Sequence, residues 1–142
     1  MALTSEATTV WHGDLMTGSG STKLDSSGLA EFPVSWKARS EGVSGQTNPE
    51  ELIGAAHSAC FSMALSGALK RAGYTADSLQ VTAAVTFDPG GGAITGSHLL
   101  LSAKIPGIAE DEFEQIAEGA KQNCPVSKAL AGIPITLEAS LA

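Results

Sequence analysis

Apolar and polar residues alternate along several stretches of this chain and follow helical spacing in others. Alternation predicts short strands near residues 8–12 and 19–24, and a clearer strand that runs from Phe32 to Arg39. One face of that strand is apolar and consists of Phe32, Val34, Trp36 and Ala38. A polar loop over residues 40–46 separates the strand from the next element.

A long helix follows this loop. Asn48 can cap it and Pro49 suits its first position, so the helix is predicted to begin there. Glu51 occupies the acidic position of a capping box, which leaves Glu50 for another role. The helix is expected to end at Arg71, because a glycine stop follows two residues later.

Two strands, a second helix and a final strand complete the pattern. Alternation predicts strands over 79–87 and 99–105, joined by the glycine-rich hairpin connection 88–92. Helical spacing then predicts a helix with an apolar stripe made of Phe113, Ile116, Ala117, Ala120 and Cys124. Pro125 ends this helix or opens a short one, and alternation over 133–141 predicts the last strand.

The order of elements predicts a single domain covering residues 1–142. It is of the α+β class, with a mostly antiparallel sheet, a long central helix and a second helix. Residues 52–69 carry no formal charge and are almost long enough to span a bilayer. Their glycines, serines and histidine, without flanking aromatic anchors, favour instead a central helix buried in a domain or a dimer. We therefore expect a dimer and no membrane span.

Composition and charge narrow the function classes. The chain is 43% hydrophobic and carries a formal net charge of −7, which gives no electrostatic footprint for nucleic acid or an anionic membrane. The N-terminal segment lacks the basic and apolar regions of a signal peptide, so a reducing, cytoplasmic compartment is expected. In such a compartment a transient catalytic disulfide is more plausible than a persistent one.

The chemistry is concentrated at Cys60 and Cys124, the only two cysteines. A cysteine in an apolar helix is usually an inert core residue, because burial raises the pKa of its thiol. A reactive Cys60 needs a nearby cation. Arg71 lies about 16 Å further along the helix, whereas the topology does not forbid the approach of Arg39. Glu50 can orient Arg39 through a bidentate pair, although a simple contact with the helix dipole explains Glu50 equally well.

Several alternatives remain open at this point. Cys124 is either a core residue or a resolving thiol that condenses with a sulfenic acid on Cys60. His57, one helical turn before Cys60, invites comparison with a zinc site, but no C-x-x-C or H-x-x-x-H pair accompanies it. His57 is therefore interpreted as a packed helix residue or as a group that tunes Cys60. The serines near Cys60 have no evident base, and the glycine-rich segment does not open a helix.

Two segments resemble those of a known family. The run T-N-P-E-E-L-I-G-A-A-H-S-A-C-F-S-M-A-L, residues 47–65, resembles the signature helix of the OsmC/Ohr family (osmotically inducible protein C and organic hydroperoxide resistance proteins). The run N-C-P-V-S, residues 123–127, resembles the family's second-cysteine motif. Length and element order also match, so the resemblance covers essentially the whole chain. The histidine in A-A-H-S-A-C and the position of Arg39 favour the OsmC branch.

The resemblance implies a thiol-dependent peroxidase that forms an intertwined homodimer and needs no metal or flavin cofactor. It implies that Cys60 attacks the peroxide, and that Cys124 resolves the product as a Cys60–Cys124 disulfide. Arg39 and Glu50 match the family's arginine and glutamate. A dithiol reductant, of the lipoyl type in part of the family, recycles the disulfide.

Organic hydroperoxides are the expected substrates, with hydrogen peroxide reduced less well. The apolar helix face around the peroxidatic cysteine is predicted to accept the alkyl group, and it comprises Ala56, Ala59, Phe61 and Met63. The alternative function is non-enzymatic. In that case the chain would be a dimeric binding or stress-response domain that keeps the fold and has inert thiols.

Overall fold

The computed structural model describes residues 1–142 and divides the chain into two compact units, residues 1–52 and residues 53–142. The boundary falls inside a single helix, between Leu52 and Ile53.

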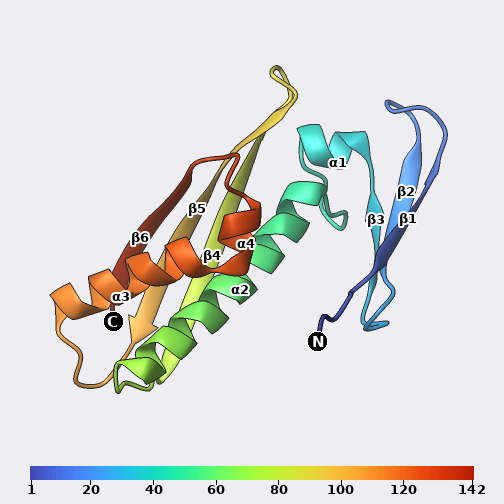
Figure 1. Cartoon of the computed structure of the whole chain (residues 1–142). Coiled ribbons are helices and arrows are strands. Elements are labelled where there is room, and N and C mark those ends of the chain that lie inside the picture. Colours follow the sequence, from blue (N-terminus) through green and yellow to red (C-terminus); the bar gives the residue numbers. More distant parts are fainter. The chain divides into compact units, whose positions relative to one another are not determined.

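The first unit contains a three-stranded antiparallel sheet. Its strands are β1 (Ala7–His12), β2 (Ser19–Leu24) and β3 (Glu31–Val34), paired in that order (Figure 1). The predictions of the first two strands are confirmed. Gly20 allows the β1 strand to pack closely, because a Cβ at this position would lie 2.8 Å from the Trp11 ring.

The third predicted strand ends early, and its second half is a short helix. The chain leaves β3 at Val34 and forms α1 (Trp36–Ser40), so the prediction of a strand up to Arg39 is wrong. Ser35 causes the change of direction, because its side-chain oxygen accepts a hydrogen bond from the Ala38 N–H at 3.1 Å and caps the helix. Arg39 therefore projects from a helical turn, and not from a strand end.

The long helix α2 (Pro49–Arg71) has the predicted bounds. Asn48 caps its N-terminus by accepting a hydrogen bond from the Glu51 N–H at 2.8 Å. At the C-terminus, Gly73 adopts a positive φ of 92°, and the Tyr74 N–H donates to the Leu69 carbonyl at 2.8 Å. This is a Schellman termination, in which the residue after the glycine closes the last turn.

By length and composition α2 is the one helix that could cross a membrane, a test that the core helix of a soluble protein also passes. In the second unit one stripe of α2 is buried, and it comprises Gly54, His57, Phe61, Leu65 and Leu69. The spacing of three and four residues places these side chains on one helix face. At Gly54 the α2 backbone packs closely against the sheet, since a Cβ there would lie 2.9 Å from the Ala83 carbonyl oxygen.

The second unit is built on another three-stranded sheet. Its strands are β4 (Ser78–Asp88), β5 (Ala93–Lys104) and β6 (Ile135–Leu141), in the order β4-β5-β6. The β4–β5 hairpin confirms the two predicted strands and the connection between them, although β5 begins at Ala93, earlier than predicted. β6 pairs parallel to β5, but the other strand pairs are antiparallel. The sheets are therefore mostly antiparallel, as expected. The final strand begins two residues later than predicted.

Two further helices follow β5. They are α3 (Glu110–Asn123) and α4 (Pro125–Ala129), and α2 and α3 lie on the same face of the second sheet (Figure 1). Cys124 was predicted to lie on the stripe of the second helix. It lies at the junction of α3 and α4, because α3 ends at Asn123, two residues before Pro125, and it is buried in the same core as Phe113 and Ala117. The core between helices and sheet includes Phe61, Leu65, Leu99, Phe113 and Ala117.

Candidate active site

The two cysteines meet inside the second unit. Cys60 is supplied by the middle of α2, and Cys124 by the junction between α3 and α4. Both thiols are free, and they are hydrogen-bond partners. Cys60 remains partly exposed, whereas Cys124 has 0% exposed surface. The predicted pair of thiols is therefore brought together, with Cys60 partly exposed and Cys124 enclosed.

The surroundings of Cys124 favour its thiolate. Burial acts to raise the pKa of the Cys124 thiol, but hydrogen bonds to its sulfur outweigh this effect and the pKa lies below its ordinary value. The donors are the Cys60 thiol, the N–H and hydroxyl of Ser127, and the Val126 N–H. Each donor stabilises negative charge on the sulfur.

The pKa of Cys60 is shifted in the opposite direction. Burial raises the pKa of the Cys60 thiol, and its hydrogen bond to Cys124 raises it further, because the proton is held between the two sulfurs. The Val126 N–H lowers the pKa of Cys60 but does not reverse the shift. Within the second unit alone, Cys60 is therefore the harder of the two thiols to ionise.

A buried histidine lies next to this pair. His57 has 0% exposed surface, and its pKa is lowered by burial, so its ring is neutral at pH 7. Its Nδ1 atom is 2.7 Å from the Ser97 hydroxyl on β5, and its Nε2 atom is 2.8 Å from the Ser127 hydroxyl on α4. Both ring nitrogens thus have serine partners, and no group of His, Cys, Asp and Glu residues is arranged to hold a metal ion.

Ser97 and Ser127 were not singled out from the sequence. Each left a signal. Ser97 shares its strand face with Leu99 and Leu101, which are buried, and a polar residue on a buried face needs a partner. Ser127 ends the N-C-P-V-S motif, three residues after Cys124. Neither pattern states which side chain is the partner, because the contact with His57 spans 40 residues in one case and 70 in the other.

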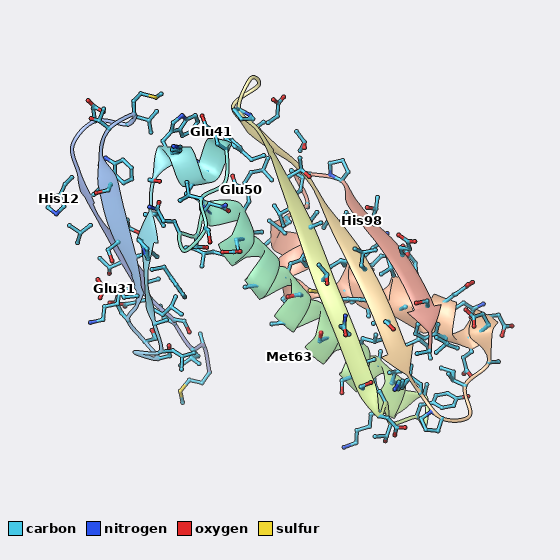
Figure 2. All side chains as sticks on the ribbon, turned by 180° about the vertical axis from the view of Figure 1, so that it is seen from behind. His12, Glu31, Glu41, Glu50, Met63 and His98 are labelled. Atoms are coloured by element: carbon cyan, nitrogen blue, oxygen red, sulfur yellow. The ribbon has the colours of Figure 1, made fainter.

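The predicted arginine and glutamate also form a pair, and both lie in the first unit. The Arg39 Nε donates to Glu50 Oε1 at 2.9 Å, and the Glu50 side chain is only 7% exposed. The pair is not the predicted bidentate one, because Glu50 Oε2 is buried without a hydrogen-bond partner. Glu50 is placed at the start of α2, as Figure 2 shows, and it is freed for this role because Glu51 bonds to Thr47.

An apolar cavity of about 380 Å³ lies beside Arg39 in the first unit. It is lined by side chains from β1, β2, β3, α1, the β1–β2 connection and the first turn of α2, among them Trp11, Leu15, Val34, Trp36 and Leu52. Arg39 is the one charged residue in its lining. The cavity can therefore hold an apolar group with a polar end directed at the guanidinium.

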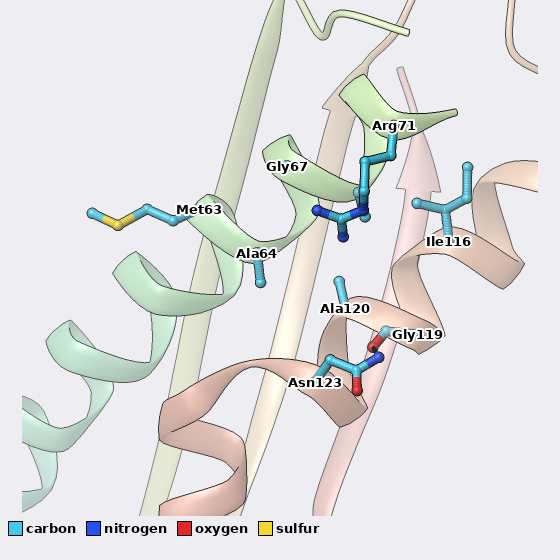
Figure 3. Close-up of a pocket in the computed structure, with 9 residues that line it drawn as sticks. Met63, Ala64, Gly67, Arg71, Ile116, Gly119, Ala120 and Asn123 are labelled. Carbon is cyan, nitrogen blue, oxygen red and sulfur yellow. Dashed lines mark hydrogen bonds between the residues drawn. The ribbon is translucent and has the colours of Figure 1, made fainter. Parts of the chain in front are cut away.

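A second cavity, of about 420 Å³, lies between α2 and α3 in the second unit. Figure 3 shows the Arg71 guanidinium and the Asn123 amide directed into it. The helix face predicted to accept an alkyl group contributes little here. Phe61 has 0% exposure and belongs to the core, so its assignment to a substrate pocket is wrong. Met63 lines this second cavity and is 74% exposed.

Comparison with known proteins gives three results that agree. Residues 42–138 match the sequence model of the family described as OsmC-like protein. Peroxiredoxin OsmC of Escherichia coli strain K12 is 46% identical over 133 residues, which cover 92% of each chain. An organic hydroperoxide resistance protein from Elizabethkingia anophelis has a similar structure, with a TM-score of 0.72 at 32% identity, covering 100% of this chain and 97% of that one.

A more distant structure extends the likeness of fold. The OsmC-like protein from Mycoplasma pneumoniae is 17% identical, with a TM-score of 0.72, and the match covers 100% of this chain and 99% of that chain. At this identity the similarity concerns the fold alone. The same α+β arrangement is thus kept across sequences that have diverged widely.

Proposed function

This chain belongs to the OsmC-like protein family and is a cysteine peroxidase, and from that premise we propose its substrate, residues and cycle. The proposed activity is the reduction of hydroperoxides, organic ones in preference to hydrogen peroxide. Cys60 is the peroxidatic residue and Cys124 the resolving one. Arg39 and Glu50 assist the first step, and a dithiol reductant completes the cycle.

The observation that carries this proposal is the contrast between the two paired sulfurs. Cys60 is partly exposed, so a peroxide from solvent can reach it, whereas Cys124 is enclosed and can react only with its neighbour. A sulfenic acid on Cys60 would form directly beside a sulfur whose pKa is lowered. This arrangement suits capture of the sulfenic acid before a second peroxide overoxidises it.

The cycle balances with two protons. When Cys60 gives up its proton, the Cys60 thiolate attacks the peroxide, an S–O bond forms, the O–O bond breaks, and the alkoxide takes up a proton and leaves as an alcohol. Cys124 then gives up its proton and attacks the Cys60 sulfur. An S–S bond forms, the S–O bond breaks, and water leaves. The dithiol supplies two electrons, restores both thiols and becomes a disulfide.

The ionisation of Cys60 needs a positive charge that favours the Cys60 thiolate. Arg39 is proposed for this role, because its guanidinium is held by the buried Glu50 carboxylate and it borders an apolar cavity. A guanidinium stabilises a thiolate and can also donate to a peroxide oxygen. The adjoining cavity, lined by Trp11 and Trp36, supports a preference for alkyl hydroperoxides.

We also propose that the whole chain acts as one domain in a homodimer in the cytoplasm. The family match over residues 42–138 spans the boundary between the two units, which supports a single functional domain. On α2, the face that does not pack in the core is uncharged and made of small residues with Met63, and such a face suits contact with a second copy. Two free thiols suit a reducing compartment.

The experiment that tests the activity uses purified protein, cumene hydroperoxide and a dithiol such as dihydrolipoamide. Cys60→Ser is expected to lose turnover, because no other thiol is accessible to peroxide. Cys124→Ser is expected to consume about one equivalent of peroxide per chain and then stop or depend on an external thiol. Undiminished turnover in Cys60→Ser would contradict the assignment of Cys60 as the peroxidatic residue.

A thiol titration separates this enzyme from a fold with inert thiols. One equivalent of peroxide should remove both thiols of the wild-type protein without linking two chains covalently. Two titratable thiols remaining after that treatment would indicate the non-enzymatic alternative. Normal turnover of Cys124→Ser with the same dithiol would be consistent with Cys60 as the peroxidatic residue but would contradict the resolving role of Cys124.

A further inference from the structure

His57 has no part in the cycle described so far, although it is buried and bonded at both ring nitrogens. Its two partners come from different elements, Ser97 from β5 and Ser127 from α4. Ser97 is 1% exposed and Ser127 is 5% exposed, so water does not compete for these hydrogen bonds. Ser127 also lies three residues after Cys124, and its hydroxyl reaches the Cys124 sulfur.

The directions of the hydrogen bonds that join Ser97, His57 and Ser127 depend on one another. A neutral imidazole has one nitrogen that donates and one that accepts. If Nδ1 carried the proton, the Ser127 hydroxyl would have to donate to Nε2 and could not donate to sulfur. If Nε2 carries it, Ser97 donates to Nδ1, Nε2–H donates to the Ser127 oxygen, and the Ser127 hydrogen is left for Cys124. Only the second arrangement directs every donor toward the sulfur.

We propose that the buried chain Ser97–His57–Ser127 is a positioning relay that directs the Ser127 hydroxyl as a hydrogen-bond donor onto the Cys124 thiolate. His57 acts through Ser127 and touches neither the peroxide nor a reacting sulfur, so it is a positioning residue. The proposal rests on the resolving role proposed above for Cys124. It assigns to the histidine of the A-A-H-S-A-C motif an effect on the second cysteine, whereas the sequence suggested an effect on Cys60.

Among the groups that face Cys124, the relay is the one whose effect on the pKa of Cys124 a substitution can test. From α2 the Cys60 thiol is its partner, and from α4 the Val126 N–H and the Ser127 N–H and hydroxyl approach it. The nearest charged residues on the adjoining helices are directed elsewhere. Lys121 of α3 pairs with Glu118 at 2.7 Å, and Lys128 of α4 is exposed. The Ser127 hydroxyl is therefore the side-chain donor, besides Cys60, that a substitution can remove.

The first test measures the pKa of Cys124 directly and needs no peroxide. In a Cys60→Ser background Cys124 is the only thiol, and its ionisation is followed by thiolate absorbance near 240 nm during a pH titration. Adding Ser127→Ala or His57→Leu is expected to raise the pKa by about one unit, as expected for loss of a hydrogen bond to a charged group. Adding His57→Gln should leave it near the parent value, because the glutamine amide can donate from the position of Nε2.

Controls separate tuning from a loss of packing. Ser62→Ala removes a hydroxyl on α2 that donates to the Ser58 carbonyl, and it should not change the pKa of Cys124. Should His57→Leu fail to fold, Ser127→Ala and His57→Gln still decide the matter. A pKa of Cys124 in Ser127→Ala equal to that of the parent overturns the relay, and so does a pKa in His57→Gln that rises as far as in Ser127→Ala.

The second test measures disulfide formation in the protein that keeps both cysteines. After one equivalent of peroxide, Ser127→Ala should form the sulfenic acid at the wild-type rate and resolve it about threefold more slowly at pH 7. A tenfold loss of thiolate is partly offset by the greater nucleophilicity of a more basic thiol. Above both pKa values the variant should resolve at least as fast as wild type, and a uniform slowing at every pH would overturn the relay.

The two proposals fail in distinguishable ways. If no sulfenic acid forms on Cys60, the peroxidase cycle is wrong, while the titration of Cys124 still reports on the hydrogen bond from Ser127. If sulfenic acid forms and resolves normally in Ser127→Ala at pH 7, the cycle stands and the relay is wrong.

Discussion

At the scale of single residues, the site depends on the ionisation of Cys60. Burial and the neighbouring Cys124 raise the pKa of Cys60 within the second unit, although the proposed chemistry requires a Cys60 thiolate. Arg39 is the proposed source of the missing positive charge. This makes the pKa of Cys60 the most informative single quantity in the molecule.

Replacement of Arg39 by alanine tests this directly. In a Cys124→Ser background, Arg39→Ala is expected to raise the pKa of Cys60 and to slow the peroxide step by ten- to a hundredfold at pH 7, which corresponds to about one to two units. The pH dependence of the single-turnover rate with cumene hydroperoxide is the measurement. Lys37→Ala, on the exposed side of the same short helix, is the matched control. An unchanged pH–rate profile in Arg39→Ala would contradict its role.

His57 makes folding stability depend on pH in a predictable direction. Its pKa is lowered by burial, so on acidification the unfolded chain takes up a proton near pH 6.5 before the native protein does. Protonation therefore favours unfolding, and stability should fall as pH decreases from 7 through this range. The slope is at most about 1.4 kcal/mol per pH unit. Urea unfolding of wild type and His57→Gln, compared from pH 7.5 to 5, isolates this contribution, which should be missing in the variant.

At the scale of elements, α2 was predicted best because three local signals agree. Asn48 caps the start, uncharged residues fill the body, and Gly73 ends it with a positive φ. The β4–β5 hairpin was predicted for a similar reason, since alternation and a glycine-rich connection point to the same structure. Local signals that agree are sufficient even without tertiary information.

The failures occur where two structures share one local pattern. Trp36 and Ala38 continue the alternation of β3, and only the cap formed by Ser35 turns this segment into α1. The prediction for Cys124 came closer, because Pro125 marks the helix break and Cys124 is buried with the apolar stripe of α3. The contacts of His57 with Ser97 and Ser127 could not be predicted, because partners so distant in sequence are set by the packed fold.

Gly54 provides a test of the packing between α2 and its sheet. A methyl group there would meet the Ala83 backbone oxygen at 2.9 Å, so Gly54→Ala is expected to lower the free energy of unfolding by about 1–3 kcal/mol, despite the better helix propensity of alanine. Gly119→Ala in α3 meets no atom within 4 Å and should be neutral or stabilise by up to about 1 kcal/mol. Chemical denaturation of both variants measures the difference, and equal effects would argue against a close α2–β4 contact.

At the scale of the whole molecule, the chain has two compact units, and the predicted site residues are divided between them. Arg39 and Glu50 belong to the first unit, and the two cysteines belong to the second. The proposed cycle needs all four. Assembly of the active form is therefore part of the function, and the proposed homodimer is the form in which activity is expected.

The proposed dimer makes a further prediction about the outer face of α2. Met63→Lys introduces a charge at a position that is 74% exposed in the single chain, so it should leave the monomer fold intact. If this face contacts a second copy, the variant should shift to a monomer in size-exclusion chromatography with light scattering. Gln115→Lys on the exposed side of α3 is the control. A variant at Met63 that remains dimeric would place the interface elsewhere.

The parallel pairing of β6 has a consequence for synthesis of the chain. β4 and β5 are neighbours in sequence and can pair as a hairpin soon after both are made, but β6 follows α3 and α4 before it reaches β5. Until then the far edge of β5 presents unpaired backbone groups beside Leu99 and Leu101, which are buried in the finished fold. A nascent or truncated chain therefore carries an aggregation-prone strand edge. Chaperones or rapid docking of α3 must protect this edge before β6 is made.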